Sequence, residues 1–293
     1  MHKAVEHSTV HHFADDTNLL CSDNDPSQLR LKMNLDLKLI FEWLCSNRLS
    51  LNVAKTEFII FKPPKKNLHE RITLKLDGTT LYESPKIRYL GLIMDERLTW
   101  KHHITELSKK LNKSIGIIFK MKKLCPQRVL MSLYYSLVHS YLNYGACVWG
   151  NAAEIHTNKI RVLHKKVIRL IANVEYNDHS SPLFKEHKIL KFDDILNMQL
   201  ACLMFDYDHG NLPKCLNTYF NRVSNIHDYD TRNATAGKLS ENVAVNTSTY
   251  GFTMFKFIGP KILNNIKDNV FYKDSNSLQS FRKKYKLHLI ENY

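Results

Sequence analysis

Polar and apolar positions near the start of the chain predict a short β-hairpin. Apolar residues occupy both sides of two adjacent aspartates, Asp15 and Asp16, within residues 8–21. Neighbouring side chains of a strand point to opposite faces, so two adjacent carboxylates approach one point only where the chain reverses. The pattern therefore predicts that the pair lies at a hairpin tip. Such a pair beside apolar residues needs cations or hydrogen bonds, which indicates a metal site, a helix cap or a turn.

The stretch at residues 25–52 predicts a helix. Its leucines alternate as in a strand, but straight-chain helix formers dominate, Asp25-Pro26 suits a cap and a first helical position, and twenty residues is long for a strand. The apolar positions cover one broad face and a second band, so we expect burial on more than one side.

Shorter elements follow this helix. Residues 52–62 predict a strand, which Pro63-Pro64 and a basic loop end, and residues 72–82 predict a hairpin about Asp77-Gly78. Residues 87–100 form another apolar run, interrupted by Gly91. The first hundred residues are therefore expected to be mixed α and β.

From Trp100 onwards, long helical segments rich in Lys and His are expected. They span residues 102–124, 126–150 and 157–173, and a basic helix is predicted near the end, at 276–290. Changes in texture suggest boundaries near residues 100 and 200. The aromatic residues of these helices are expected mainly in the core, although some could stack on bases.

Charge and composition restrict the class of partner. The chain has 42 Lys and Arg against 28 Asp and Glu, a net charge of +14, which favours a polyanion such as nucleic acid. No stretch is apolar enough for a membrane span and no secretory signal is evident, so we expect a cytoplasmic or nuclear protein that does not bind membranes. The six cysteines have no CxxC spacing and are expected to be reduced and mostly buried.

Four sequence blocks occur in an order that identifies a family resemblance. "FADD" on a hairpin, a helix, "NRLSLNVAKTEFIIF" and "IRYLGLIMDERLTW" resemble the second half of the reverse-transcriptase palm of jockey- and CR1-like non-long-terminal-repeat retrotransposons. Later stretches, including "LYYSLVHSYLNYGACVWGN" and "HDYDTRNA", resemble the thumb and C-terminal region of those elements. The resemblance implies an α+β fold with a partial palm at 1–99, a helical thumb at 100–200 and a C-terminal region at 201–293.

The resemblance also assigns chemistry to the aspartate pair. Reverse transcriptases perform in-line nucleotidyl transfer with two Mg²⁺ ions, which prefer oxygen ligands. The resemblance implies that Asp15 is a direct metal ligand and that Asp16, at the same tip, contacts the metal less directly. The implied partners are an RNA template, a DNA primer and deoxynucleotides.

Two further motifs receive roles from the resemblance. Lys55 matches a lysine near the triphosphate that can donate a proton to the departing pyrophosphate. From the residues alone, a lysine on a strand edge is ordinarily solvated or a guard against edge pairing. Tyr89, Leu90 and Gly91 match the hairpin that holds the primer end, with Gly91 allowing a close backbone approach; an ordinary glycine-kinked strand is the alternative.

The predicted helix at 157–173 carries a basic stripe opposite its apolar stripe. Its members are Lys159, Arg161, Lys165, Lys166 and Arg169. The stripe could follow a phosphate backbone or be a solvated helix face, and the sequence leaves both alternatives open.

A two-metal site needs a further carboxylate, which the family supplies from a strand well upstream of the hairpin. The candidates here lie in polar turns or on the amphipathic helix, and they are Asp23, Asp25, Asp36, Asp77 and Asp95. We therefore expect an N-terminally truncated reverse transcriptase that does not polymerise alone. The alternatives are a non-catalytic nucleic-acid-binding remnant and a protein that associates with itself or with an intact polymerase.

Overall fold

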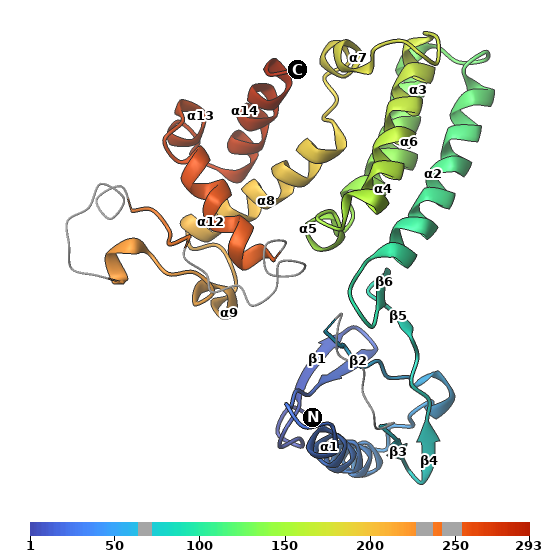
Figure 1. Ribbon diagram of the computed structural model, residues 1–293, viewed down its shortest axis with the longest axis vertical. Coiled ribbons are helices and arrows are strands. Elements are labelled where there is room, and N and C mark those ends of the chain that lie inside the picture. The colour runs from blue at the N-terminus through green and yellow to red at the C-terminus, as the bar shows by residue number, and fades with distance from the viewer. Residues whose placement is uncertain (64–71, 227–236, 242–253) are drawn as a thin grey trace. The chain divides into compact units, whose positions relative to one another are not determined.

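The chain folds into two compact units in a computed structural model that describes residues 1–63, 72–226, 237–241 and 254–293 (Figure 1). The first unit is Met1–His102 and the second is His103–Tyr293. Hairpins and one long helix build the first unit, whereas helices dominate the second. The mixed helix and strand content agrees with the predicted α+β class.

Three antiparallel hairpins form the strands in the described part of the first unit. They are β1 (Thr9–Phe13) with β2 (Asp16–Leu20), β3 (Leu74–Leu76) with β4 (Thr79–Leu81), and β5 (Lys86–Tyr89) with β6 (Leu92–Asp95). Asp77-Gly78 and Leu90-Gly91 form the tips of the second and third hairpins, and all four residues have positive φ angles, 48° and 72° in one turn and 45° and 78° in the other. This is the two-residue turn whose twist matches that of the strands. The hairpins predicted at residues 8–21 and 72–82 are confirmed.

Helix α1 (Pro26–Ser46) packs against two of these hairpins. It begins as predicted, with the Asp25 carboxylate accepting a hydrogen bond of 3.1 Å from the Ser27 amide. Leu37 joins a core cluster with the β3–β4 side chains, and Ile40 packs with Val10 of β1. The predicted burial of the second leucine band is wrong in part.

Leu31 and Leu35 are the members of that band that contradict the prediction, because they are 58% and 41% exposed. The two hairpins cover a limited arc of α1, so leucines outside that arc stay in contact with solvent. Binary patterning alone could not identify which leucines the hairpins would cover.

The strand predicted at residues 52–62 is also wrong. A 3₁₀ turn, η1 (Val53–Lys55), and a single bridge between Phe58 and Glu83 stand in its place. Val53, Phe58 and Ile60 are partly buried against the β3–β4 cluster, and the Lys62 ammonium lies 2.9 Å from the Glu83 carboxylate and 3.2 Å from the Glu96 carboxylate. Side-chain packing and ion pairs therefore hold this segment without a regular ladder. The basic loop that follows lies partly outside the described residues.

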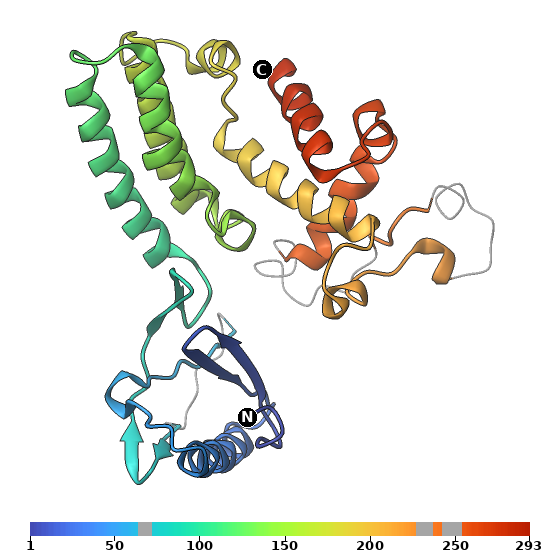
Figure 2. The same ribbon diagram turned by 180° about the vertical axis from the view of Figure 1, so that it is seen from behind.

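Helices of very different lengths build the described part of the second unit, which also contains two short non-α segments (Figures 1 and 2). They are α2 (Lys101–Met121), α3 (Gln127–Tyr134), the π-helical η2 (Tyr135–His139), α4 (Ser140–Asn143), α5 (Ala146–Trp149), α6 (Glu154–Ala172), α7 (Ser180–Glu186), α8 (Phe192–Asp208), α9 (Lys214–Asn217), the 3₁₀ turn η3 (Val223–Asn225), α12 (Phe255–Ile266), α13 (Val270–Lys273) and α14 (Leu278–Glu291). The helices predicted at 102–124, 157–173 and 276–290 are confirmed. The segment 126–150 is helical but changes geometry at η2 and breaks at Gly145, which has a φ of 61°.

Helix α8 is central to the second unit. It contacts α4, α5, α12 and α14, and Figures 1 and 2 both show α12 and α14 beside it. Residue 200 lies inside α8, so the helix continues through the position where a change in texture suggested a boundary. The labels palm, thumb and C-terminal region remain predictions.

Aromatic residues fill the core of this unit. Tyr134 and Trp149 are completely buried, as expected of aromatics at helical spacing, and the Trp149 ring stacks on Phe192 with centroids 5.6 Å apart. Tyr135 and Tyr144 are 41% and 56% exposed. The core therefore takes some of the candidate stacking residues and leaves others at the surface.

The cysteines are all free thiols, as expected, but the prediction that most are buried is wrong. Only Cys202 is buried, while Cys45 and Cys215 are exposed. Across the described ranges, none of the helices combines the length and the apolar character that crossing a bilayer requires.

Candidate functional site

The aspartate pair lies at the tip of the β1–β2 hairpin. Phe13 faces Asp16 across the ladder, which leaves Ala14 and Asp15 as the two turn residues, and Ala14 takes a left-handed φ of 51°. Both aspartates are exposed, and neither side chain makes a hydrogen bond or an ion pair with the described part of the chain. The tip therefore carries two carboxylates that are not occupied by interactions with any residue the structure describes.

Other carboxylates considered for the same site are engaged elsewhere. Asp36 is fully buried in α1 and accepts hydrogen bonds from the backbone amides of Glu6, at 2.9 Å, and His7, at 3.1 Å. Burial raises the pKa of Asp36, but hydrogen bonds from Ser8 and the backbone amides outweigh it and lower the pKa overall. Asp36 therefore anchors the N-terminal segment on α1.

Asp95 has a comparable structural task at the end of β6. Its carboxylate accepts hydrogen bonds from the amides of Arg97, Thr99 and Trp100 at 3.0–3.2 Å, and so fixes the turn that leads into α2. Asp23 pairs with Lys32 at 2.5 Å. Within the described ranges, His, Cys, Asp and Glu side chains form no group of three that could hold a metal ion.

The other residues assigned to the polymerase site lie on separate elements of the first unit. Lys55 is the last residue of η1 and is exposed, and no hydrogen bond or ion pair in the described part joins it to the aspartate pair. Tyr89 ends β5, and Leu90-Gly91 forms the tip of the third hairpin. The structure thus confirms a hairpin at the assigned primer-holding motif, while its role stays a prediction.

The basic stripe of α6 divides into engaged and exposed members. The Arg161 guanidinium contacts both carboxylate oxygens of Asp193 at 2.8–3.0 Å, and Arg169 donates to the Asp178 carbonyl at 2.7 Å. The remaining members, Lys159, Lys165 and Lys166, are exposed. A phosphate backbone on this face would therefore meet the three lysines first.

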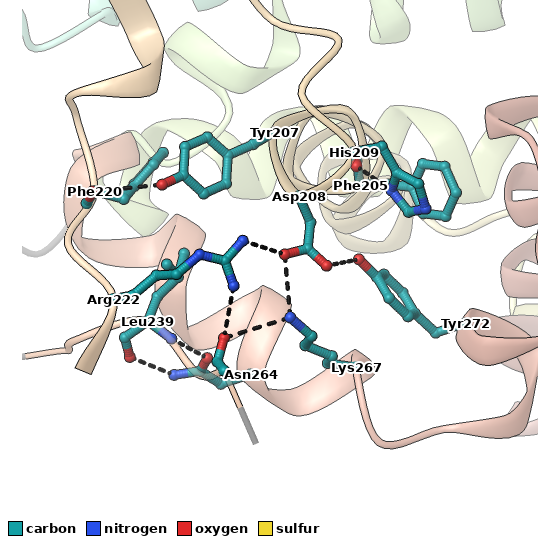
Figure 3. Close-up of polar contacts among 11 residues, drawn as sticks. Phe205, Tyr207, Asp208, His209, Phe220, Arg222, Leu239, Asn264, Lys267 and Tyr272 are labelled. Carbon is teal, nitrogen blue, oxygen red and sulfur yellow. Dashed lines mark hydrogen bonds and ion pairs between the residues drawn. The ribbon is translucent and has the colours of Figure 1, made fainter. Parts of the chain in front are cut away.

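The second unit also contains a charge cluster that no sequence motif indicates (Figure 3). The Asp208 carboxylate at the end of α8 lies 3.1 Å from Arg222 and 3.1 Å from Lys267, and it accepts a hydrogen bond of 2.8 Å from the Tyr272 hydroxyl. Burial raises the pKa of Asp208, but Tyr272 and the two cations outweigh it, so the pKa is lowered. Arg222 and Lys267 also donate to the Gly237 carbonyl.

Asp208 therefore ties together segments from α8 to α13. Its partners are 14, 59 and 64 residues away in sequence, and no local pattern could have found them. Both of its carboxylate oxygens are engaged, one by Arg222 and Lys267 and the other by Tyr272, so Asp208 has a structural role.

A buried Tyr134–His164 pair links α3 to α6. The Tyr134 hydroxyl lies 2.9 Å from His164 Nε2, and the two rings stack with centroids 5.8 Å apart. Burial, and to a smaller extent His139, lower the pKa of His164 to about 3. His164 is therefore a neutral core residue.

The chain resembles several retrotransposon polymerases in sequence. It is 30% identical over 159 residues to the RNA-directed DNA polymerase from mobile element jockey of Drosophila funebris, covering 52% of this chain and 17% of that protein. The jockey polymerase of Drosophila melanogaster is 30% identical over 129 residues, covering 42% and 14%. The probable RNA-directed DNA polymerase from transposon X-element of the same species is 24% identical over 160 residues, covering 53% and 17%.

These matches cover only part of each polymerase, and the chain spans about a sixth of the length of these curated relatives. No protein-family model and no solved structure matches the chain. The segment "HDYDTRNA" lies outside the described residues, so the fold does not bear on that part of the resemblance. Over about half of its length, the chain is related to the RNA-directed DNA polymerases of jockey-like non-LTR retrotransposons and is consistent with a part of such a reverse transcriptase.

Proposed function

We propose that the chain is a piece of a jockey-like reverse transcriptase and that Asp15 and Asp16 supply one carboxylate pair of its nucleotidyl-transfer site. The observation that carries this proposal is the location of the pair at an exposed hairpin tip, unoccupied by structural interactions, in a chain related to RNA-directed DNA polymerases. A turn-stabilising or capping aspartate would instead bond to nearby backbone amides, as Asp25 and Asp95 do.

The donor chemistry of the tip suits a hard divalent cation such as Mg²⁺, which prefers carboxylate oxygens. Two carboxylates are too few to hold the metal ions, and no third metal-ligating side chain lies beside the pair among the described residues. We therefore propose that the remaining ligands come from another segment of the polymerase, and that this chain by itself does not extend a primer. In the same proposal, Lys55 acts near the triphosphate, and Tyr89, Leu90 and Gly91 hold the primer end on the RNA template.

Primer extension by a chimera tests the assignment. Residues 1–293 would replace the segment of the Drosophila funebris jockey polymerase that contains the 159-residue match, and extension of a DNA primer on an RNA template would be measured with Mg²⁺. We expect extension by the chimera, its loss in Asp15→Asn, and none by the purified chain alone. Asp193→Asn, which changes an exposed carboxylate of the second unit, is the matched control and should retain activity. Extension by the chain alone, or by Asp15→Asn in the chimera, would contradict the proposal.

Nucleic-acid binding without catalysis is a second candidate function. The net charge of +14 and the exposed Lys159, Lys165 and Lys166 favour it. Binding of a labelled RNA–DNA duplex should weaken steeply with salt, as phosphate contacts require, and should not change in Asp15→Asn. A binding curve that does not depend on salt would exclude this candidate.

Association through the first unit is a third candidate. Phe13 and Leu20, on the β1–β2 hairpin, are 61% and 55% exposed, and within the described residues β1 and β2 pair only with each other. Unpaired strand edges beside exposed apolar side chains favour strand addition. Sedimentation with and without nucleic acid separates the two non-catalytic candidates, since only association predicts an oligomer in the absence of nucleic acid.

A further inference from the structure

A cleft in the second unit carries more positive than negative charge. It has a volume of about 490 Å³ and lies between η2–α5, α8 and α14. Its apolar floor includes Ile195 and Met198, both of them buried. Sites of this volume, with an apolar floor and a few polar groups, are typical of small-molecule ligands.

Two cations of α14 line the cleft from one side. Arg282 and Lys286 are one helical turn apart, so they share a face of the helix and repel each other. Neither makes an ion pair with any carboxylate in the described ranges, and burial lowers the pKa of Lys286. Asp206 is the carboxylate that lines the same cleft, and it leaves one positive charge in excess.

The Asp208 cluster of the same unit contains two cations whose charge is balanced by a carboxylate. Arg222 and Lys267 both lie 3.1 Å from the Asp208 carboxylate and also donate to a backbone carbonyl. Arg282 instead lies beside the Cys202 thiol, a weak acceptor. Within the described residues, the α14 pair therefore lacks the direct ion pairs that Arg222 and Lys267 make with Asp208.

The opposite wall of the cleft supplies groups of a different kind. His139 lines the cleft, and its Nδ1 atom is buried with no hydrogen-bond partner in the described part of the chain. A buried polar atom of this kind requires an explanation, such as an ion or ligand that completes it. Tyr135 also lines the cleft, and it is 41% exposed, so an aromatic face borders the opening.

The π-helical turn η2 brings these two side chains to the same wall. The rings of Tyr135 and His139 meet edge to face, with centroids 5.5 Å apart, while Tyr134 and Val138 of the same stretch are completely buried. Local π turns inside α-helices occur frequently at functional sites because they redirect side chains.

We propose that this cleft binds an organic phosphate with a flat aromatic body, such as a nucleoside monophosphate, through Arg282, Lys286 and His139. The two cations take the phosphate group, to which a His139 ring nitrogen adds a hydrogen bond. The aromatic body lies on the apolar floor next to Tyr135. The phosphate can belong to a free nucleotide or to the 5′ end of a single strand, since both present the same group. This site lies outside the first unit and does not depend on the polymerase assignment.

Calorimetric titration of the full chain tests the proposal, with adenosine 5′-monophosphate, adenosine and inorganic phosphate as separate probes. We expect saturable binding of the monophosphate and at least tenfold weaker binding of adenosine and of inorganic phosphate. Arg282→Gln and Lys286→Gln should each weaken monophosphate binding about tenfold. Lys283→Gln removes the same charge from the same helix at a position that does not line the cleft, and it should bind as the wild type does. Circular dichroism verifies that each variant is folded.

Binding of a short single-stranded RNA, with and without a 5′ phosphate, shows whether the bound phosphate belongs to a free nucleotide or to the end of a strand. Preference for the phosphorylated strand over the free monophosphate assigns the site to strand ends, and the reverse preference assigns it to free nucleotides; either result supports the proposal. Equal binding of adenosine and its monophosphate, or equal loss in Lys283→Gln and Lys286→Gln, would overturn it. So would the absence of saturable binding by every phosphorylated probe. As a second readout, the His139 ring resonances should shift on binding, while those of His102 in the first unit should not.

Discussion

Two acidic sites of this molecule differ in almost every physical respect. The carboxylates of Asp15 and Asp16 are exposed at a hairpin tip and make no ion pair or hydrogen bond with the described residues. The Asp208 carboxylate is nearly buried and binds two cations and a tyrosine hydroxyl. A carboxylate whose oxygens already accept hydrogen bonds and form ion pairs stabilises the fold and has little capacity to bind a cation. A carboxylate pair with free oxygens contributes little to stability and retains its capacity for a cation.

The largest effect should come from Asp208→Asn. The substitution leaves Arg222 and Lys267 without a counter-charge at a site where the carboxylate is only 11% exposed. Because an unpaired charge in a desolvated site is costly, we expect the free energy of unfolding to fall by about 2–4 kcal/mol. Urea denaturation followed by circular dichroism measures it.

Asp193→Asn is the matched control for that experiment. Asp193 also pairs with an arginine, but it is 55% exposed, so its loss should cost less than about 1 kcal/mol. Equal costs for the two variants would show that the Asp208 cluster is a surface network rather than a structural centre.

Acid should destabilise the second unit through His164, the next largest effect. Its pKa is about 3 in the folded protein and 6.5 when unfolded, so the unfolded state binds the proton more readily. The stability is complete above pH 6.5 and is lost as the pH falls towards 3, with a loss of about 2 kcal/mol at pH 5. Tyr134 and His139 are its titratable neighbours, and the pKa of His139 is also lowered.

Denaturation midpoints measured between pH 7 and pH 5 check this prediction, because carboxylates titrate mostly below that range. His164→Gln, whose amide can still bond to the Tyr134 hydroxyl, should lose most of the slope. A wild-type midpoint that stays constant from pH 7 to pH 5 would show that His164 is accessible to protons in the folded state.

The sequence predicted correctly those elements that depend on residues close together in the chain. The Asp25-Pro26 start of α1, the Asp77-Gly78 turn and the long amphipathic helices each depend on residues within a few positions of one another. The exposure of Leu31 and the irregular path of residues 56–62 depend on distant hairpins and ion pairs, so the sequence could not predict them. The location of the aspartate pair was predictable because a two-residue turn fixes it, whereas the Asp208 cluster assembles residues up to 64 positions apart.

The backbone conformation at the hairpin tips also affects stability. Leu90 has a φ of 45° at the tip of the third hairpin, a conformation that costs a branched residue about 1 kcal/mol and that asparagine adopts more readily. Leu90→Asn should therefore stabilise the hairpin by about 0.5–1 kcal/mol, which slower hydrogen exchange of the β5–β6 amides would report. Leu90→Val, with its β-branched side chain, should exchange faster than the wild type. Faster exchange in both variants would mean that packing of the Leu90 side chain outweighs the backbone strain.

The smallest effect on stability should come from substitution of the aspartate pair. Its size distinguishes a pair that stabilises the turn from a pair that binds a cation. If Asp15 only stabilises its turn, Asp15→Ala should cost about as much as Asp77→Ala, for which we expect about 1 kcal/mol because Asp77 holds a φ of 48° that alanine disfavours. If Asp15 is kept for a cation, Asp15→Ala should change the free energy of unfolding by less than about 0.5 kcal/mol, because its carboxylate makes no structural contact in the described residues. Parallel urea titrations of the two variants measure the difference. A cost for Asp15→Ala that matches that of Asp77→Ala would remove the structural basis for assigning the pair to a metal site.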